Sequence, residues 1–553
     1  MGDNPGVSTG RFRRTRGKAA RDQRGGVRSR RVGAFGRLRT GIEGLERLVG
    51  TRAGALVLFA LALAAYAVRA LAWPATAGRD LDEYVLAYIQ LFDAHPLLPW
   101  SMLFRTPVTP IVAGVSLDLG VAETVLAVLY ALSIVAWTGA ARAFGRRAAL
   151  VTAVALLLYQ GYALMFHELS SEPVFAAAFA GLAFALARAA ESPSPGRFVV
   201  VGVGVALCAL VRPGNAVLLA LGLFPLALFG TWRLRLQWAA GVAAAALVPL
   251  GGWTLHNGLR FDEWNVARGG NAVFPFYRAF ITDHIVAPRN GNASERLADA
   301  MRRRLLTREP YRSYHVTLGE LFRRGSFRVH EDLYLLSDEV FGWRSDYAIL
   351  RDAGLEAVGA HPGTYARGVL TTVWEELTRA HFRVVGGEAP ERRPAVRRGR
   401  LPPPGEGEPI PAGQTVWISR PDNSIRQDWT SPTAYRFVFR KPEQRPRFEE
   451  IVRRRDELLN AFPHRAPSEE LARRLNQLSR WYPRPLHWLL IGLVGLALRR
   501  PRGFRLLVAL PVAALLVVVL NALGLFTDLH FILPVAPAFV VFAVGALLGP
   551  RRR

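Results

Sequence analysis

The chain has 553 residues, 51% of them hydrophobic, and a formal net charge of +27. That hydrophobic share is high for a soluble protein, and the apolar residues come in blocks that approach the roughly 20 residues needed to cross a bilayer. We therefore expect a membrane protein. The single cysteine, Cys208, excludes an intrachain disulfide and a cysteine-rich metal site.

The positive charge is almost entirely arginine, since Lys18 and Lys441 are the only lysines. A basic chain can bind nucleic acid. Here the arginines cluster in the tails and between apolar runs, which is the pattern of membrane topology signals. We therefore expect no nucleic-acid partner. The Arg-rich, Ala-rich and Gly-rich composition is typical of a GC-rich genome and favours a bacterial source.

The first segment, residues 1–52, is polar, glycine-rich and arginine-rich. It cannot bury enough apolar surface to fold alone, so we expect a disordered basic cytoplasmic tail. The first apolar run begins too far along the chain for an ordinary cleaved signal peptide.

The pattern predicts a mainly α polytopic membrane protein with about ten transmembrane helices. Residues 53–255 would form an N-terminal transmembrane module, and residues 485–553 would form the C-terminal transmembrane helices. The ten predicted spans are 54–74, 120–141, 148–166, 172–190, 198–211, 214–231, 236–255, 485–499, 503–525 and 530–548.

The orientation follows from the arginines. With ten spans, the basic tail falls on the same side as "ARAFGRR" (141–147), "TWRLR" (231–235), "RRPRGFR" (499–505) and the closing "RRR". The positive-inside rule makes that side cytoplasmic. We expect a multi-pass plasma membrane protein with both termini in the cytoplasm.

Residues 256–484 would then form a large extracytoplasmic soluble region. This region is polar, rich in Trp, Tyr and Arg, and interrupted by Pro and Gly. Residues 390–413 are typical of an exposed loop. Residues 361–377 have Val369, Leu370 and Val373 at helical spacing, which predicts an amphipathic helix on the membrane surface or on the core of this region.

A group of carboxylates follows the first predicted span. "RDLDEY" contains Asp80, Asp82 and Glu83. A carboxylate there could take a proton from an attacking hydroxyl, or bind a divalent cation through its oxygens. The alternative is a solvated loop in which Asp80 caps a helix that starts near Leu81.

A second group interrupts the apolar texture in "MFHELSSEPVF" (165–175), with His167, Glu168 and Glu172. Ionisable groups close to a membrane are costly and tend to mark function. The alternative is a wet turn in which Glu172 starts a helix, because an acid in the first turn suits the helix dipole.

Two further turns on the same side carry charge. "LVRPGN" contains Arg212, which could bind a phosphate, or anchor the chain at the headgroups. "FTDLHF" contains Asp528 and His530, and a histidine there could contact a phosphate or shuttle a proton; the alternative is a polar turn. Together these groups would line one cavity suited to a substrate with a lipid tail and an anionic head.

The order of these motifs resembles that of the polytopic GT-C glycosyltransferases. The closest resemblance is to the family that contains protein O-mannosyltransferases and lipid A aminoarabinose transferases, over roughly residues 55–260 and 485–548. The motifs that carry it are "DLDEY", "FRTPVTPIVAGVSLDLG", "ARAFGRRAALV", "SEPVFAAAFAGLAFAL", "LVRPGN" and "HFILPVAPAFVVF".

The resemblance implies that a sugar moves from a polyprenyl-phosphate donor to an acceptor hydroxyl of a glycan, lipid or protein, with inversion at the anomeric carbon. An acidic residue of the first external loop would be the general base. We prefer Asp82, with Asp80 second and Glu83 third. Glu168 or Glu172 would supply the acid of the second turn, and Arg212 would lie near the donor.

The resemblance has one departure and leaves one cofactor open. His530 stands where the family usually has an arginine, so either His530 does not bind the donor phosphate or the donor differs from that of the family. Some GT-C enzymes need a divalent cation and others do not, and no metal-binding motif in this sequence decides between them.

Two other classes of protein fit part of the pattern. A transporter or flippase of lipid-linked substrates would also carry polar groups at helix ends, but it more often shows internal repeats and polar groups near the bilayer midplane. A scaffold of the cell envelope would leave the polar turns without a shared purpose.

Overall fold

The protein is seen in a computed structural model that describes residues 40–323, 325–379, 415–431, 434–462, 465–499, 501–526 and 529–551. The chain is mainly helical, at 74%, with few strands. Most of the predicted tail 1–52 and the whole predicted loop 390–413 lie outside the described residues.

The part of the chain that the structure describes contains five helices that are long and apolar enough to cross a membrane. Their bounds agree closely with five of the predicted spans. In lipid, a spanning segment must satisfy its own backbone hydrogen bonds, which a helix does. The five are α2 (Arg52–Ala70), α6 (Ala122–Ala141), α9 (Ser171–Glu191), α11 (Trp232–Phe261) and α21 (Phe504–Gly524).

The other five predicted spans are shorter or interrupted, so the count of ten is not confirmed. Prolines account for part of this, because proline cannot continue an α-helical hydrogen-bond ladder. The segments are α7 (Arg146–Leu157) with α8 (Gln160–Met165), α10 (Pro195–Val211), the 3₁₀ segment η2 (Pro213–Ala227), α20 (Pro485–Arg499), and α22 (Leu529–Ile532) with α23 (Pro537–Leu548).

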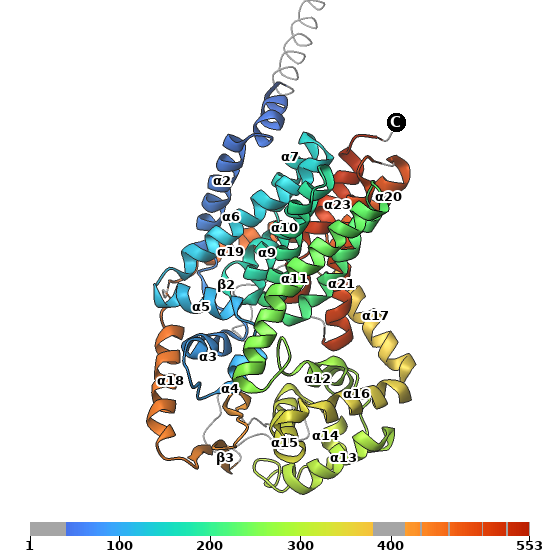
Figure 1. Ribbon diagram of the computed structural model, residues 1–553. Helices are drawn as coiled ribbons and strands as arrows, with labels where there is room; N and C mark the ends of the chain where they lie inside the picture. Colours follow the sequence, from blue (N-terminus) through green and yellow to red (C-terminus); the bar gives the residue numbers. More distant parts are fainter. Residues whose placement is uncertain are drawn as a thin grey trace, which may run out of the picture.

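These helices form one bundle (Figure 1). Helix α10 packs between α9 and α11, and α23 packs against both α20 and α21. The contacts depend on small residues. A Cβ added to Gly202 on α10 would lie 2.4 Å from the Val242 carbonyl oxygen of α11, so the two backbones approach closely, as is usual for helices packed in membranes.

Most of the elements between residues 256 and 484 form a lobe at one end of the bundle (Figure 1). The strands β3 and β4 pair as an antiparallel hairpin, with Ile425 opposite Phe439. The elements of the lobe are α12 (Gly270–Ala272), η3 (Val273–Thr282), η4 (Pro288–Asn290), α13 (Asn292–Ala300), η5 (Met301–Leu305), α14 (Leu318–Arg323), α15 (Phe327–Phe341), η6 (Trp343–Ser345), α16 (Ala348–Ala360), α17 (Pro362–Thr378), η7 (Val416–Ile418), β3 (Ile425–Ser431), β4 (Ala434–Phe439) and α18 (Gln444–Leu459). Helix α19 (Glu469–Arg480) leaves the lobe and packs beside the bundle.

The predicted amphipathic helix at 361–377 is present as α17. Val369 is buried and Val373 is half-buried against both the lobe and the bundle, whereas Leu370 is exposed. The buried face of the helix is therefore narrower than predicted, because it contains two of the three residues.

A buried arginine joins the lobe to the bundle. Arg278 of η3 donates hydrogen bonds to the carbonyl oxygens of Ala522 and Leu525, at 2.7 and 3.0 Å, where α21 ends. The same guanidinium pairs with Asp283 at 2.9 Å. A cation at a helix C-terminus satisfies carbonyls that have no partner inside the helix.

The chain between α2 and α6 lies between the bundle and one side of the lobe (Figure 1). It contains β1 (Thr76–Ala77), α3 (Leu81–Leu91), α4 (Pro99–Phe104) and α5 (Val108–Asp118). Strand β1 pairs in parallel with β2 (Glu168–Leu169), which follows α8. A 3₁₀ turn, η1 (Arg142–Phe144), ends the helical run of α6 at the opposite end of the bundle.

Candidate functional site

A short strand pair brings the two sequence motifs with carboxylates together. The Thr76 N–H donates to the His167 carbonyl at 2.9 Å, and the Gly78 N–H donates to the Leu169 carbonyl at 3.1 Å. A Cβ at Gly78 would lie 2.9 Å from the Leu169 oxygen, so only glycine fits this approach. The loop after α2 and the turn before α9 therefore lie side by side.

Asp80 precedes α3 with a positive φ of 57°, in the left-handed region that Asp tolerates better than most residues. Its side chain makes no hydrogen bond to the start of the helix. Asp80 therefore stands at the N-cap position of a helix that starts at Leu81, as the alternative expected, but its side chain does not cap that helix. The carboxylate lies 3.1 Å from Nη2 of Arg105 instead.

Arg105 holds two of the predicted acids at once. Its Nε donates to Glu83 at 2.9 Å, and the same guanidinium pairs with Asp80. The guanidinium also lies 4.9 Å from the ring centroid of Tyr84 and 4.8 Å from that of Phe104. The sequence motifs did not indicate Arg105. The available signal was its place in "FRTP", at the start of the proline-containing stretch that leads to the second predicted span.

A second ion pair joins two other segments. Nη1 of Arg212, which follows α10, lies 3.1 Å from Oε1 of Glu172, in the first turn of α9. Glu172 is almost fully buried, with a side chain 2% exposed. A buried carboxylate is stable there because a cation and further hydrogen-bond donors replace its water; the Ser171 hydroxyl is 3.4 Å away.

An aromatic ring joins the two ion pairs. Phe531 of α22 lies 5.5 Å from the guanidinium carbon of Arg212 and 5.9 Å from that of Arg79. Arg79 also lies 5.5 Å from Phe526, and its Nε is 3.9 Å from Asp80. Stacking on aromatic faces is a preferred environment of arginine.

Six ionisable residues that take part in these ion pairs form what we call the loop cluster. They come from the chain between α2 and α5, from the start of α9 and from the end of α10. Three cations face three carboxylates, and the members are Arg79, Asp80, Glu83, Arg105, Glu172 and Arg212.

The charges around Asp80 shift its titration. Burial alone would raise the pKa of Asp80, but three guanidinium groups outweigh it and hold that pKa below the usual value. These are the groups of Arg105, Arg79 and Arg212. Asp80 is therefore ionised at neutral pH.

Glu83 has the opposite balance. Burial raises the pKa of Glu83 against the opposing charge of Arg105, and the carboxylates of Asp80 and Asp82 add to the rise. The pair bound to Arg105 thus contains one carboxylate that ionises easily and one that ionises less easily.

Asp82, the preferred base in the sequence, is exposed on α3 and belongs to neither ion pair. On a helix, Asp82 and Glu83 point in directions about 100° apart. The geometry therefore favours Asp80 over Asp82 as the acid that shares a site with the arginines.

His167 does not contact the loop cluster. It is buried, stacks on Tyr66 with ring centroids 4.2 Å apart, and lies 6.2 Å from Trp73. Burial, together with the charge of Arg69, lowers the pKa of His167 to about 3, so the imidazole is neutral. Its neighbour Glu168 is half-buried on β2, opposite Thr76.

The last predicted motif is only partly described. Asp528 lies outside the described residues. His530 lies on α22, close enough to Glu172 to interact with its charge. The conspicuous contact from this motif is that of Phe531 with Arg79 and Arg212, which sequence analysis did not single out.

A metal site does not stand out in the described ranges, where no three His, Cys, Asp or Glu side chains are grouped to hold an ion. In the loop cluster, Asp80 and Glu83 already bind Arg105. A divalent cation at these oxygens would have to displace a guanidinium, so the donor set does not fit a metal.

A cavity was expected beside these groups. Two cavities of the protein lie away from these groups. One, of about 550 Å³, lies beside α18, and one, of about 420 Å³, lies between the β3–β4 hairpin and the segment around Arg308. Four of the predicted side chains, those of Asp80, Glu83, Glu172 and Arg212, converge in the loop cluster, whereas these two cavities belong to the lobe.

Comparison of the chain with protein-family models, with curated proteins and with solved structures found no match in any of the three. Inferences about function therefore depend on the sequence motifs and on the geometry of the loop cluster.

Proposed function

We propose that this protein is a membrane glycosyltransferase of the GT-C type, which moves a sugar from a polyprenyl-phosphate donor to an acceptor hydroxyl. The observation that carries the proposal is the loop cluster. Charged side chains from separate segments meet where apolar helices end, with an ionised carboxylate beside three arginines.

The chemistry needs a base and a group that accepts a phosphate. Asp80 takes the proton from the acceptor hydroxyl while that oxygen forms a bond to the anomeric carbon. The bond from this carbon to the phosphate oxygen breaks, and polyprenyl phosphate leaves with the electron pair. Attack opposite the leaving group inverts the anomeric configuration.

Arg212 and Arg79 suit the phosphate. Both guanidinium groups approach Phe531, from two different segments, and bidentate donors of this kind bind phosphate well. Each already has a carboxylate near it, Glu172 for Arg212 and Asp80 for Arg79. Donor binding would therefore exchange part of these contacts for contacts to phosphate.

We further propose that the bundle crosses the membrane about ten times, with both termini in the cytoplasm and the lobe outside. The short helices α10, α20 and α23 would then complete the spans inside a bundle whose long helices contact lipid. The arginine-rich turns between the helices lie at one end of the bundle, and this supports the orientation.

The deciding experiment compares Asp80→Asn with Asp82→Asn in membranes supplied with radiolabelled polyprenyl-phosphate sugars. Loss of a general base costs about 10²–10⁴-fold in rate. We expect a loss in that range for Asp80→Asn. The matched control, Asp82→Asn, should keep most of the activity because Asp82 is exposed.

Equal activity of Asp80→Asn and wild type would refute the assignment of Asp80. A loss with Asp82→Asn alone would restore the base that the sequence motif favoured. Movement of a labelled lipid across vesicle membranes, without consumption of the donor, would show a transporter instead.

A further inference from the structure

Helix α19 has two different faces. Leu471, Ala472 and Leu475 pack on Ala72, Trp73 and Leu164 at the edge of the bundle. Leu478 continues the stripe of Leu471 and Leu475 beyond the edge of the bundle and is 59% exposed, and Trp481, just past the helix, is 88% exposed. The side turned away from the bundle carries Arg473 and Arg474. Large exposed apolar side chains beside charged ones are typical of helices that lie in a membrane interface.

Both ends of α19 are held at ends of bundle helices. The Ser468 N–H donates to the carbonyl of Leu71, directly after α2, at 2.8 Å. At the other end, Tyr482 stacks on Tyr159 with centroids 4.2 Å apart, just before α20 begins. The helix therefore runs along the rim of the bundle, where α2 ends and α20 starts.

The neighbouring surface is continuous with that of a long apolar helix. Val68 of α2 is 53% exposed, and Leu71 is 62% exposed. Lipid that covers this side of α2 would reach the rim and meet the outer face of α19.

The charge of this face is complementary to phosphate. Arg473 and Arg474 have side chains 68% and 71% exposed, and both bind the one carboxylate of Glu470. From residue 469 to 484 the sequence has four arginines and two glutamates. Long basic side chains next to an apolar face can keep their charges at the headgroups while their stems cover lipid.

We propose that α19 is an interfacial membrane helix, and that its outer face binds anionic phospholipid headgroups at the rim of the bundle. Leu478 and Trp481 enter the headgroup region, and Arg473 and Arg474 contact lipid phosphates. This surface is separate from the loop cluster and does not depend on the proposed reaction. It fixes the depth at which the chain from Leu71 to Asp80 leaves the membrane.

The chain suits a labelling test, because its one cysteine, Cys208, is fully buried. In a Cys208→Ala background, Leu478→Cys and Trp481→Cys are labelled with a fluorophore. The full-length protein is then placed in phosphatidylglycerol-containing nanodiscs that carry a nitroxide on the lipid headgroup. Leu71→Cys is the control for lipid contact, and Glu295→Cys on the exposed side of α13 is the control for water.

We expect quenching at 478 and 481 close to that at 71 and well above that at 295. Quenching should fall when phosphatidylcholine replaces phosphatidylglycerol, or when Arg473 and Arg474 are both changed to Gln. Values at 478 and 481 nearer to that at 295 overturn the proposal. Crosslinks between two copies at these positions overturn it as well, because a second copy would then cover the face. Equal quenching in both lipids overturns the preference for anionic headgroups.

Discussion

Arg105 binds two acids and helps to keep one of them, Asp80, ionised. Its guanidinium binds Asp80 and Glu83 and lies between two aromatic rings, which restrict its movement. The pKa of Asp80 is held below its usual value, so the ionised pair stabilises the fold above the ordinary pKa of a free carboxylate. That stabilisation is lost as the pH falls through the lower, folded pKa.

Arg105→Gln should therefore move the acid limb of the pH profile of kcat/KM upward, toward neutral pH. Removal of this guanidinium raises the pKa of Asp80, because a neighbouring cation favours the ionised carboxylate. The measurement is the initial rate of sugar transfer in membranes across a pH series.

A matched control for this change is Arg344→Gln. Arg344 also pairs with an aspartate, Asp262 at 2.8 Å, but its side chain is 86% exposed and belongs to the lobe. Its acid limb should coincide with that of wild type. An unchanged acid limb in Arg105→Gln would mean that Asp80 is not the group that titrates in the rate.

At the scale of elements, the pairing of β1 with β2 is the contact that places two loops in one site. The two strands have only two residues each, and the approach depends on Gly78. So short a pair contributes little stability of its own. Its value is positional, because Asp80 follows β1 and Glu172 follows β2.

Gly78→Ala should separate β1 from β2, because the new methyl group would lie 2.8 Å from the Ser170 Cβ and 2.9 Å from the Leu169 oxygen. We expect a destabilisation of about 1–3 kcal/mol, typical of an overpacked site, together with a loss of transfer. The midpoint of thermal unfolding in detergent measures the first effect, and the radiolabel assay measures the second.

Gly181→Ala on α9 is the control, since a Cβ there meets nothing within 4 Å. In a helix interior alanine is favoured over glycine by up to about 1 kcal/mol, so this variant should be at least as stable as wild type. If Gly78→Ala unfolds at the wild-type midpoint and keeps full transfer, the strand pair does not position the site.

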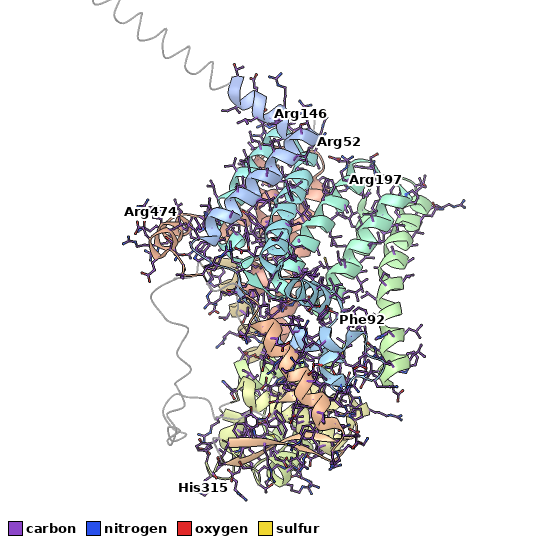
Figure 2. All side chains as sticks on the ribbon, turned by 90° about the vertical axis from the view of Figure 1, so that its left-hand side faces the viewer. Arg52, Phe92, Arg146, Arg197, His315 and Arg474 are labelled. Atoms are coloured by element: carbon purple, nitrogen blue, oxygen red, sulfur yellow. The ribbon has the colours of Figure 1, made fainter. Side chains whose placement is uncertain are left out.

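At the scale of the whole molecule, the two ends differ in their charge. Figure 2 shows Arg52, Arg146 and Arg197 toward the end of the bundle that is away from the lobe, and His315 at the far end of the lobe. Aspartates and glutamates accompany the arginines in the lobe, where many surface arginines form ion pairs. The excess positive charge at the opposite end predicts that this end faces the cytoplasm.

Cysteine labelling of intact cells tests this orientation. In the Cys208→Ala background, His315→Cys should react with a membrane-impermeant maleimide added outside. Arg146→Cys should react only after permeabilisation. The buried Cys208 of the unmodified chain gives the background signal. The reverse pattern would place the lobe in the cytoplasm and remove the basis for extracytoplasmic transfer.

The long helices are the part of the fold that could be predicted from the sequence. The bounds of α2, α9 and α21 agree closely with apolar runs, because a continuous apolar run long enough to span lipid has few alternatives to a helix. Proline explains two of the predicted spans that did not form one helix. In 214–231 and 530–548 the composition is apolar, but η2 and the break before α23 show that local proline geometry decides whether one helix forms.

The candidate site could be predicted in its motifs but not in its pairings. The sequence indicated Asp80, Glu172 and Arg212 as functional because charged groups at the ends of apolar runs are costly without a role. It could not show that Arg105 binds Asp80, since the two are 25 positions apart and on different elements. Nor could it show that Asp82 points away, because three acids within four residues are equivalent until the helix that carries them has a direction.

The sequence by itself determined that this protein has long apolar helices able to cross a membrane and arginine-rich turns between them, because hydropathy and charge act locally along the chain. Only the tertiary structure decided which carboxylates meet which arginines. That choice depends on a two-residue strand pair, on a glycine without a side chain and on the packing of helices distant in sequence, and each of these is a contact between segments that no local pattern records.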